Sequence, residues 1–174
     1  MPTIYLAGPD VFWPNAVELG AAKKQCCQQY GFEGLFPLDN TLDLSSLSPY
    51  QAGLAIYHAN IALMDRCDLV IANMTPFRGP SMDVGTAFEM GYITALNKPV
   101  WGYSLDGRLY SDRVDGIETD ADGFTIEAFN MIDNLMMVGA LNQQGGLLAE
   151  ERENTLDNHL YVFDQLLQQI HKSR

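Results

Sequence analysis

The amino-acid sequence predicts an α/β protein: a flavodoxin- or Rossmann-like parallel sheet with helices on both faces, in a single domain that spans residues 1–174. Short β-rich runs alternate with segments of helical periodicity, and helical crossovers between strands imply parallel pairing. The run DLVIA at 68–72 is almost entirely apolar, which is typical of a central strand covered on both sides. A chain of 174 residues with 47% apolar composition can bury one core.

The first three elements are a strand, a helix and a second strand. Residues 3–7 (TIYLA) are rich in β-formers and stop at a Gly-Pro pair, so they predict the first strand. Residues 15–30 follow as a helix, with a proline at its start and Gly31 directly after its last turn. Residues 32–36 (FEGLF) then predict a short second strand, which Pro37 ends.

The middle of the chain continues the same alternation. A helix is predicted over 49–65, because its apolar residues recur at helical spacing. Its core-facing residues are expected to be Leu54, Tyr57, Ile61 and Met64. The strand at 68–72 comes next, and the loop at 73–82 is rich in turn formers. A helix over 84–96 and a strand over 99–103 complete a β-α-β-α-β-α-β order.

The last part of the chain is predicted to contain an irregular segment and two helices. Residues 104–128 are polar and acidic, and the helices are expected at 130–143 and 149–170. The final helix carries one apolar stripe, made of Leu156, Leu160, Phe163, Leu167 and Ile170. In open parallel sheets, ligands bind at the carboxyl ends of strands near a reversal of strand order. The loops that leave those ends are therefore the expected binding region.

Composition and charge exclude several kinds of partner. The net charge of −12 argues against nucleic acid or an anionic membrane, since both attract basic surfaces. No apolar run reaches the length of about 18 residues that a membrane span needs, and the N-terminus lacks a signal-peptide pattern, so a cytoplasmic protein is expected. The cysteines and histidines have no metal-ligand spacing and are expected to be packing or surface residues: Cys26, Cys27, Cys67, His58, His159 and His171.

Two carboxylates stand in a small and apolar segment, SMDVGTAFEMGY at 81–92. If the helix starts at Val84, Asp83 is its N-cap and Glu89 lies in its second turn. Six residues correspond to about 240° on a helix, so the two acids can converge only if Asp83 bends over the helix end. Gly85, one turn before Glu89, leaves room for a ligand.

Two interpretations of this pair remain open at the level of sequence. In one, Asp83 is a cap and Glu89 is a solvated helical side chain, as most acids are. In the other, the two acids work together in a pocket, because the neighbours of Glu89 offer it no polar stripe. Burial would raise the pKa of Glu89 and the helix N-terminus would lower it, and the sequence does not decide between them.

The chain resembles the nucleoside 2-deoxyribosyltransferases, and the resemblance runs from the first strand to about Met136. Five motifs carry it, in order: IYLAGPDVF at 4–12, FPLDN at 36–40, RCDLVIANMTPFRGPSMDVGTAFEMGY at 66–92, KPVWGY at 98–103 and NLM at 134–136. The resemblance implies exchange of nucleobases on a 2-deoxyribosyl group by double displacement through a covalent glutamyl intermediate, in nucleoside salvage. It implies 2′-deoxynucleosides and free nucleobases as substrates, with no metal and no other cofactor.

The same resemblance assigns roles to residues of this chain. Glu89 matches the family nucleophile, and Asp83 matches an aspartate that lines the sugar and base site. Further substrate-binding residues are implied at Tyr5, Gly8, Pro9, Asp10, Phe12, Phe77, Arg78 and Gly79. Asn134 and Met136 match a motif that reaches into a neighbouring subunit's site, which implies a homo-oligomer, a dimer or larger.

One position departs from the family pattern. Asn60 stands where several members have aspartate, and an amide is no general acid at neutral pH. The leaving base could then be protonated by Asp83, by water or by another group. Two rival functions stay open: a hydrolase of 2-deoxynucleoside 5′-monophosphates and a non-enzymatic nucleoside or nucleotide sensor. Asp83 disfavours the first, because a carboxylate repels a phosphate.

Overall fold

One parallel sheet organises the chain, which a computed structural model describes over its whole length, Met1–Arg174. The strands lie in the order β2-β1-β3-β4-β5, and every neighbouring pair is parallel. Their bounds are Thr3–Ala7 for β1, Glu33–Leu35 for β2, Leu69–Asn73 for β3, Val100–Ser104 for β4 and Gly146–Ala149 for β5. The predicted parallel α/β architecture is confirmed.

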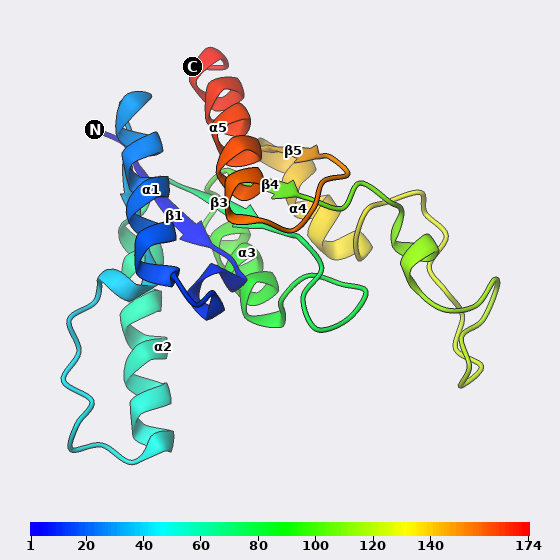
Figure 1. Cartoon of the computed structure of the whole chain (residues 1–174), viewed down its shortest axis with the longest axis horizontal. Helices are drawn as coiled ribbons and strands as arrows, with labels where there is room; N and C mark the ends of the chain where they lie inside the picture. Colours follow the sequence, from blue (N-terminus) through cyan, green and yellow to red (C-terminus); the bar gives the residue numbers. More distant parts are fainter.

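Five helices cover both faces of the sheet (Figure 1). Their bounds are Ala16–Gln29 for α1, Pro49–Arg66 for α2, Val84–Ala95 for α3, Leu135–Gln144 for α4 and Leu156–Lys172 for α5. Helices α1 and α5 pack against one face, and α2, α3 and α4 against the other. Every residue of β3 is buried, which explains why this strand is almost entirely apolar.

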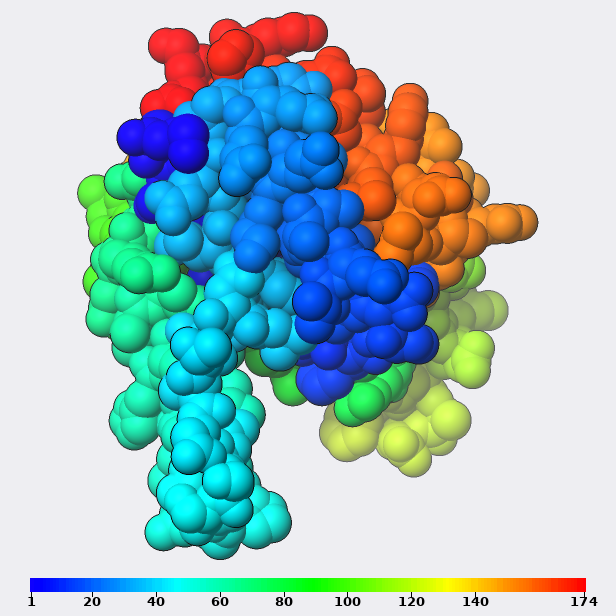
Figure 2. Space-filling view, turned by 60° about the vertical axis from the view of Figure 1, so that its left-hand side comes forward, coloured from blue at the N-terminus to red at the C-terminus, as the bar shows by residue number.

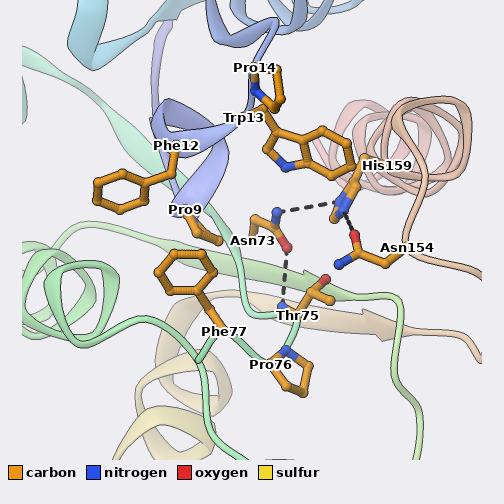
Figure 3. A pocket seen from close by; sticks show the side chains of 10 residues that line it. All are labelled: Pro9, Phe12, Trp13, Pro14, Asn73, Thr75, Pro76, Phe77, Asn154 and His159. Atoms are coloured by element: carbon orange, nitrogen blue, oxygen red, sulfur yellow. Dashed lines mark hydrogen bonds between the residues drawn. The ribbon is translucent and has the colours of Figure 1, made fainter. Parts of the chain in front are cut away.

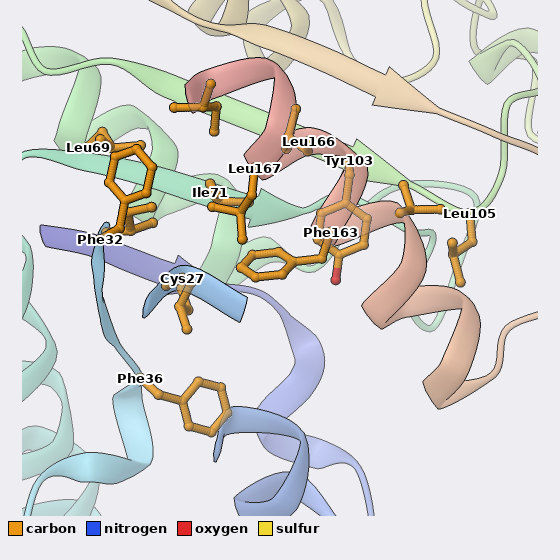
Figure 4. Close-up of a cluster of buried hydrophobic side chains, with 14 residues drawn as sticks. Cys27, Phe32, Phe36, Leu69, Ile71, Tyr103, Leu105, Phe163, Leu166 and Leu167 are labelled. Carbon is orange, nitrogen blue, oxygen red and sulfur yellow. The ribbon is translucent and has the colours of Figure 1, made fainter. Parts of the chain in front are cut away.

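The core consists of two hydrophobic clusters of equal size, one on each face of the sheet. The cluster under α1 and α5 joins aromatic rings, among them Phe32, Phe36 and Phe163, to the β1 and β3 side chains (Figure 4). In α5, the expected stripe is fully buried at Phe163, Leu167 and Ile170. Helices thus cover both faces, and cavities can open at the ends of the strands.

The C-terminal third differs from the prediction at two elements, and at the first of them the helix expected over 130–143 begins only at Leu135. The helix expected over 149–170 begins only at Leu156, and residues 146–149 form a fifth strand beside β4. This strand is four residues long, so its apolar run is too short to separate from the helix that follows. Gly145 admits the close pairing, because a Cβ there would lie 1.6 Å from the Val100 carbonyl oxygen.

Helix α2 differs from the prediction in which of its residues reach the core. Leu54 and Tyr57, which were expected to face the core, are 43% and 46% exposed, while Met64 is buried. The N-terminal half of α2 and the loop before it project beyond the sheet, as the cyan lobe in Figures 1 and 2 shows. The helical periodicity was therefore correct, but the first turns of its apolar stripe have no core beneath them.

The segment between β4 and α4 is irregular, as predicted, and is tied down at two places. It contains a short 3-10 helix over Tyr110–Arg113 and a single bridge between Thr119 and Thr125. The carboxylate of Asp133 is buried, accepts from the Met82 amide at 3.0 Å and hydrogen-bonds the Ser81 hydroxyl. None of the helices has the combination of length and hydropathy that a membrane crossing requires.

Strand order reverses between β1 and β3. The chain leaves β1 towards β2 on one side, and the later strands are added on the other side of β1. Adjacent crossovers that diverge in this way leave a crevice at the carboxyl ends of the two strands. The loops after Ala7 and Asn73 border that crevice.

Candidate active site

A cavity of about 370 Å³ opens at the carboxyl ends of β1 and β3, on the side of α2 and α3. It is lined by Gly8, Val11, Phe12, Pro37, Leu38, Ile56, Asn60, Asp83, Gly85, Thr86 and Glu89. A second hollow of about 420 Å³ between α2 and α3 shares Ile56, Asn60, Gly85 and Glu89 with it. Glu89 therefore stands where the two spaces meet.

Glu89 is half-buried in the second turn of α3 and is held by one hydrogen bond. The hydroxyl of Tyr5, whose ring is buried in β1, donates to Glu89 Oε1 at 2.5 Å. Burial raises the pKa of the Glu89 carboxyl to about 7, the Tyr5 hydrogen bond opposes this, and the charge of Asp83 adds to it. No cation contacts Glu89, so its carboxylate is poorly compensated.

Asp83 caps α3 from outside the helix. Its backbone is extended (φ −60°, ψ 133°), and Oδ2 accepts from the Thr86 amide at 2.9 Å and from the Thr86 hydroxyl at 3.0 Å. Because Asp83 bends over the helix end, its side chain and that of Glu89 line the same cavity. The structure thus meets the geometric condition for a working pair, and Glu89 is not a freely solvated helical residue.

Asn60 faces Glu89 from α2. It lines both spaces, and its Oδ1 atom is buried without a hydrogen-bond partner in the protein. Ile56 lies one turn earlier and lines the same wall. The sequence singled out Asn60 but missed Ile56, although the spacing of four residues on one helix would have found it.

Residues of the loop after β1 lie on both faces of the sheet, and only some of them line the cavity. Gly8 has φ +154°, and a Cβ there would lie 2.8 Å from the Asn73 Cβ, so the turn requires glycine. Phe12 lines the cavity beside Gly8. Pro9 and Asp10 do not: Pro9 borders a different hollow, and Asp10 is fully buried on the α1 side. Asp10 is therefore an internal ion-pair partner in this structure and does not reach the cavity.

An aromatic pair lies beside the cavity: Phe12 lines it, whereas Phe77, which was expected to bind substrate, does not line it and instead stacks on Phe12. The rings of Phe12 and Phe77 stack at a centroid distance of 5.4 Å and an angle of 10°. The Arg78 guanidinium lies 5.1 Å from the Phe12 centroid and 4.6 Å from that of Phe77, which suits a cation–π contact. Arg78 and the exposed Gly79 do not line the cavity, and of the two only Arg78 contacts the rings beside it.

Asn134 and Met136 lie away from the cavity of their own chain. Asn134 caps α4: its Oδ1 accepts from the Met136 amide at 3.0 Å, and its Nδ2 donates to Glu127 at 2.7 Å. Met136 is 67% exposed. Neither residue lines any of the hollows around Glu89, so within one chain they are not part of that site.

A second polar group, which the sequence analysis missed, lies buried on the α1 and α5 side of the same strand ends. We call Asp10, Lys23, Asn73, Tyr103 and His159 the internal polar cluster. Lys23 Nζ donates to Asp10 Oδ2 at 2.6 Å and to the Tyr103 hydroxyl at 2.7 Å. Asn73 Nδ2 donates to Asp10 Oδ1 at 2.9 Å. Lysines in amphipathic helices are usually exposed to solvent, so nothing in the sequence indicated that Lys23 would be buried.

Comparison with known proteins connects this geometry to a family. The sequence model described as nucleoside 2-deoxyribosyltransferase matches residues 4–136, the stretch that carries the cavity and both acids. The chain belongs to the nucleoside 2-deoxyribosyltransferase family. Membership supports an enzyme of glycosyl transfer, by transfer or by hydrolysis at the glycosidic bond. The described side chains include no group of three or more His, Cys, Asp or Glu residues placed to share a metal ion.

Three known proteins illustrate how far the likeness extends. An uncharacterized protein of Schizosaccharomyces pombe is 35% identical over 86% of this chain and 81% of its own length. A 2-desoxiribosyltransferase from Leishmania mexicana is 31% identical, with a TM-score of 0.70, over 93% of this chain and 97% of the other. A CMP N-glycosidase from Clostridium botulinum is 15% identical, with a TM-score of 0.50 over 94% and 98% of the chains, and shares the fold alone.

Proposed function

We propose that this protein transfers the 2-deoxyribosyl group from one nucleobase to another, with Glu89 as the nucleophile, in nucleoside salvage. The proposal rests on one observation: the Glu89 carboxylate lines a cavity, accepts a hydrogen bond from Tyr5 and has no cation beside it. A carboxylate with a raised pKa in a cavity is a candidate for chemistry more than for stability. The likeness to the Leishmania mexicana transferase supports the same reaction.

The reaction has two displacements. The free Oε2 oxygen of Glu89 attacks the anomeric carbon, the bond from that carbon to the base nitrogen breaks, and the base leaves with the electron pair. A second base then attacks the same carbon through a ring nitrogen, which gives up its proton to water or to the Asp83 carboxylate, and the glycosyl-oxygen bond to Glu89 breaks. Two inversions give net retention, as in retaining glycosidases. Tyr5 orients Glu89 by holding Oε1, which leaves the other oxygen for the sugar.

The remaining polar groups fit supporting roles. Oδ2 of Asp83 is engaged by Thr86, so Oδ1 is available to accept from a sugar hydroxyl, and the 5′-hydroxyl suits it. A sugar without the 2-hydroxyl develops positive charge at the anomeric carbon more readily, and a nearby carboxylate stabilises that charge. Asn60 can orient a base by hydrogen bonding but cannot protonate it. Asp83 or water is then the proton donor to the leaving base.

We also propose that the working form is a homo-oligomer. The projecting half of α2 and the face of α3 beside it expose apolar side chains that no part of this chain covers: Tyr50, Leu54, Ile56, Tyr57, Val84 and Phe88. Exposed apolar patches of this kind mark protein interfaces. Mixing Glu89→Gln with Asn134→Ser subunits, each inactive alone, is expected to restore transfer if one chain completes the site of another. Serine keeps the helix cap but removes the amide.

Hydrolysis of nucleoside 5′-monophosphates is the alternative. Arg78 and Ser81 are the groups near the site that could hold a phosphate, but Arg78 covers two aromatic rings and the Ser81 hydroxyl bonds Asp133. Asp83 would repel a phosphate by roughly 1–4 kcal/mol at close range. These contacts favour a neutral 5′-hydroxyl over a phosphate.

An exchange assay tests the proposal. The protein is incubated with 2′-deoxyinosine and free adenine, and the products are separated by chromatography. Formation of 2′-deoxyadenosine supports transfer, and release of free deoxyribose without new nucleoside supports hydrolysis. Mass spectrometry of the trapped protein should place the sugar on Glu89. Label on any other residue would contradict the assigned nucleophile, and no reaction with a panel of 2′-deoxynucleosides and bases would favour a sensor.

A further inference from the structure

A separate hollow of about 190 Å³, which Glu89 does not line, lies beside the Phe12–Phe77 pair (Figure 3). We call it the rear cavity; it is lined by Pro9, Phe12, Trp13, Pro14, Asn73, Thr75, Pro76, Phe77, Asn154 and His159. Phe12 is the one residue that borders both this hollow and the 370 Å³ cavity. The crevice between β1 and β3 thus opens on both faces of the sheet.

Aromatic rings line the rear cavity on at least two sides. Phe12 and Phe77 lie at one end, and Trp13 covers another side, edge-on to His159 at 5.6 Å between ring centroids (Figure 3). Rings that surround a space in this way favour a flat ligand, because aromatic pairs prefer stacked or edge-to-face contact. The walls therefore select a planar ring over an aliphatic chain.

The polar groups of the rear cavity offer hydrogen-bond donors. His159 Nδ1 faces two donors, Asn73 Nδ2 and the Tyr103 hydroxyl, each at 3.3 Å, so its proton resides on Nε2. That proton goes to Asn154 Oδ1 at 2.7 Å, which leaves Asn154 Nδ2 without a partner in the protein. The Thr75 hydroxyl oxygen accepts from the Leu105 amide at 3.1 Å, so its own hydrogen is free.

No charged side chain lines the rear cavity. Burial lowers the pKa of His159 to about 4, with the charge of Lys23 acting in the same direction, so the imidazole is neutral at pH 7. The Asp10–Lys23 ion pair lies behind the wall with both side chains almost fully buried, and the two charges offset each other. The surroundings suit an uncharged ligand that carries acceptor oxygens or nitrogens.

The volume of the rear cavity limits the size of the ligand that it can hold. A cavity of about 150 Å³ in a protein core binds benzene, so a space of about 190 Å³ fits a single six-membered ring with small substituents. We propose that the rear cavity binds a free pyrimidine base such as uracil, with its carbonyl oxygens accepting from Asn154 Nδ2 and the Thr75 hydroxyl. This site is distinct from the sugar site at Glu89 and does not depend on the proposed transfer reaction.

Fluorescence of Trp13 reports on this binding. Titrating the protein with uracil alone, where no sugar donor is present, should quench the tryptophan signal to saturation with one site per chain. The Trp13→Phe variant, which keeps Trp101, should lose the quench, while calorimetry should still detect binding in that variant. Adenine, with two fused rings, should bind at least about tenfold more weakly, because the space holds one ring.

Matched variants test the two donors. Asn154→Leu and Thr75→Val should each weaken uracil binding by about tenfold, the value of one hydrogen bond to a buried acceptor. The control is Gln169→Leu, which removes an exposed amide of α5 away from the rear cavity and should leave binding unchanged. Equal affinity in all three variants would overturn the proposal, as would the absence of saturation up to the solubility limit of uracil.

Competition separates this site from the base position beside Glu89. In Glu89→Gln protein, saturating 2′-deoxyuridine should leave the affinity for uracil within about threefold of its value without the nucleoside. A uracil dissociation constant that rises in proportion to the nucleoside concentration would place uracil at the base position and overturn the proposal. If 2′-deoxyuridine fails to bind at all while uracil still quenches Trp13, the proposed transfer function fails and the rear cavity stands.

Discussion

A fully buried acid, Asp10, and a half-buried acid, Glu89, lie near the carboxyl ends of the same two strands, one on each face of the sheet, and their surroundings are opposite. Asp10, after β1, is fully buried and accepts from Lys23 Nζ at 2.6 Å and Asn73 Nδ2 at 2.9 Å. Glu89, on α3, has one neutral donor, Tyr5, and a neighbouring acid that raises its pKa. Burial alone therefore does not mark a carboxylate as a candidate for chemistry, whereas burial without a compensating charge does.

The contrast extends to the groups around each acid. In the internal polar cluster, the Lys23 ammonium also contacts the Tyr103 hydroxyl at 2.7 Å, and the neutral His159 completes the network. Such a network fixes the loop after β1, which carries Gly8 and Phe12 into the cavity. Beside Glu89, by contrast, Asn60 Oδ1 is buried without a partner. Unpaired buried polar atoms cost about 1–3 kcal/mol each, so they are expected where a ligand supplies the missing bond.

The largest effect should follow from removing the uncompensated acid. Glu89→Gln is expected to lower the transfer rate on the order of 10⁴-fold, about 5 kcal/mol of transition-state stabilisation, because the glycosyl-enzyme bond cannot form. Initial rates of base exchange measure this, and the exposed Glu18→Gln on α1 is the matched control. Retention of more than a tenth of the activity in Glu89→Gln would show that the two acids do not differ as described.

Removing the cation of the compensated pair should instead affect folding. Lys23→Met leaves Asp10 buried without its cation, and we expect the free energy of unfolding to fall by about 3–5 kcal/mol. Chemical denaturation measures the loss. Lys24→Met is the matched control, since the neighbouring Lys24–Asp39 pair is about one-third exposed and should contribute about 0–1 kcal/mol. Equal losses in both variants would mean that the buried Asp10–Lys23 pair contributes no more to the free energy of unfolding than the partly exposed Lys24–Asp39 pair.

The same comparison predicts how stability depends on pH at Glu89. Its pKa is raised from 4.5 to about 7 in the folded chain, so the unfolded chain ionises first as pH rises. The folded state therefore loses stability between pH 4.5 and 7, by roughly 3 kcal/mol in total. Glu89→Gln removes this loss, so the variant should be more stable than the natural protein above pH 7 and equal to it near pH 4. Denaturation midpoints across that range measure the difference, and equal stability at all pH values would contradict it.

His159 should give the opposite slope. Its pKa is lowered from 6.5 to about 4, so the unfolded chain gains the proton first as pH falls, and stability is lost between pH 6.5 and 4. In the natural protein the two slopes oppose each other between pH 4.5 and 6.5. With Glu89→Gln as the background, stability should rise with pH across that interval. A flat profile in Glu89→Gln would contradict the buried neutral state of His159.

The sequence predicted one of the two acids far better than the other. The parallel sheet and the placing of Asp83 and Glu89 around a helix N-terminus followed from local patterns: an apolar strand, a cap residue and an acid in apolar company. The internal polar cluster did not, because Asp10 and Lys23 are 13 residues apart with a turn between them, and only tertiary packing buries both. The fifth strand and the projecting half of α2 were missed for a similar reason, since their state depends on what lies beside them.

The smallest expected effect comes from removing the one hydroxyl that donates a hydrogen bond to Glu89, that of Tyr5. Tyr5→Phe keeps the buried ring and removes the hydrogen bond at 2.5 Å that favours the ionised carboxylate, so the pKa of Glu89 should rise further. At pH 7 a smaller fraction of Glu89 is then ionised, and the transfer rate should fall by about tenfold, the equivalent of one hydrogen bond. The limb of the pH–rate profile that rises through about pH 7 should move to higher pH, and the rate should recover in alkaline buffer. Tyr92→Phe, which removes a hydroxyl bonded to Asp65 on the surface, should leave the profile in place. If Tyr5→Phe lowers the rate equally at every pH, Tyr5 positions Glu89 without changing its ionisation. The raised pKa of Glu89 would then be set by burial and by the charge of Asp83 alone.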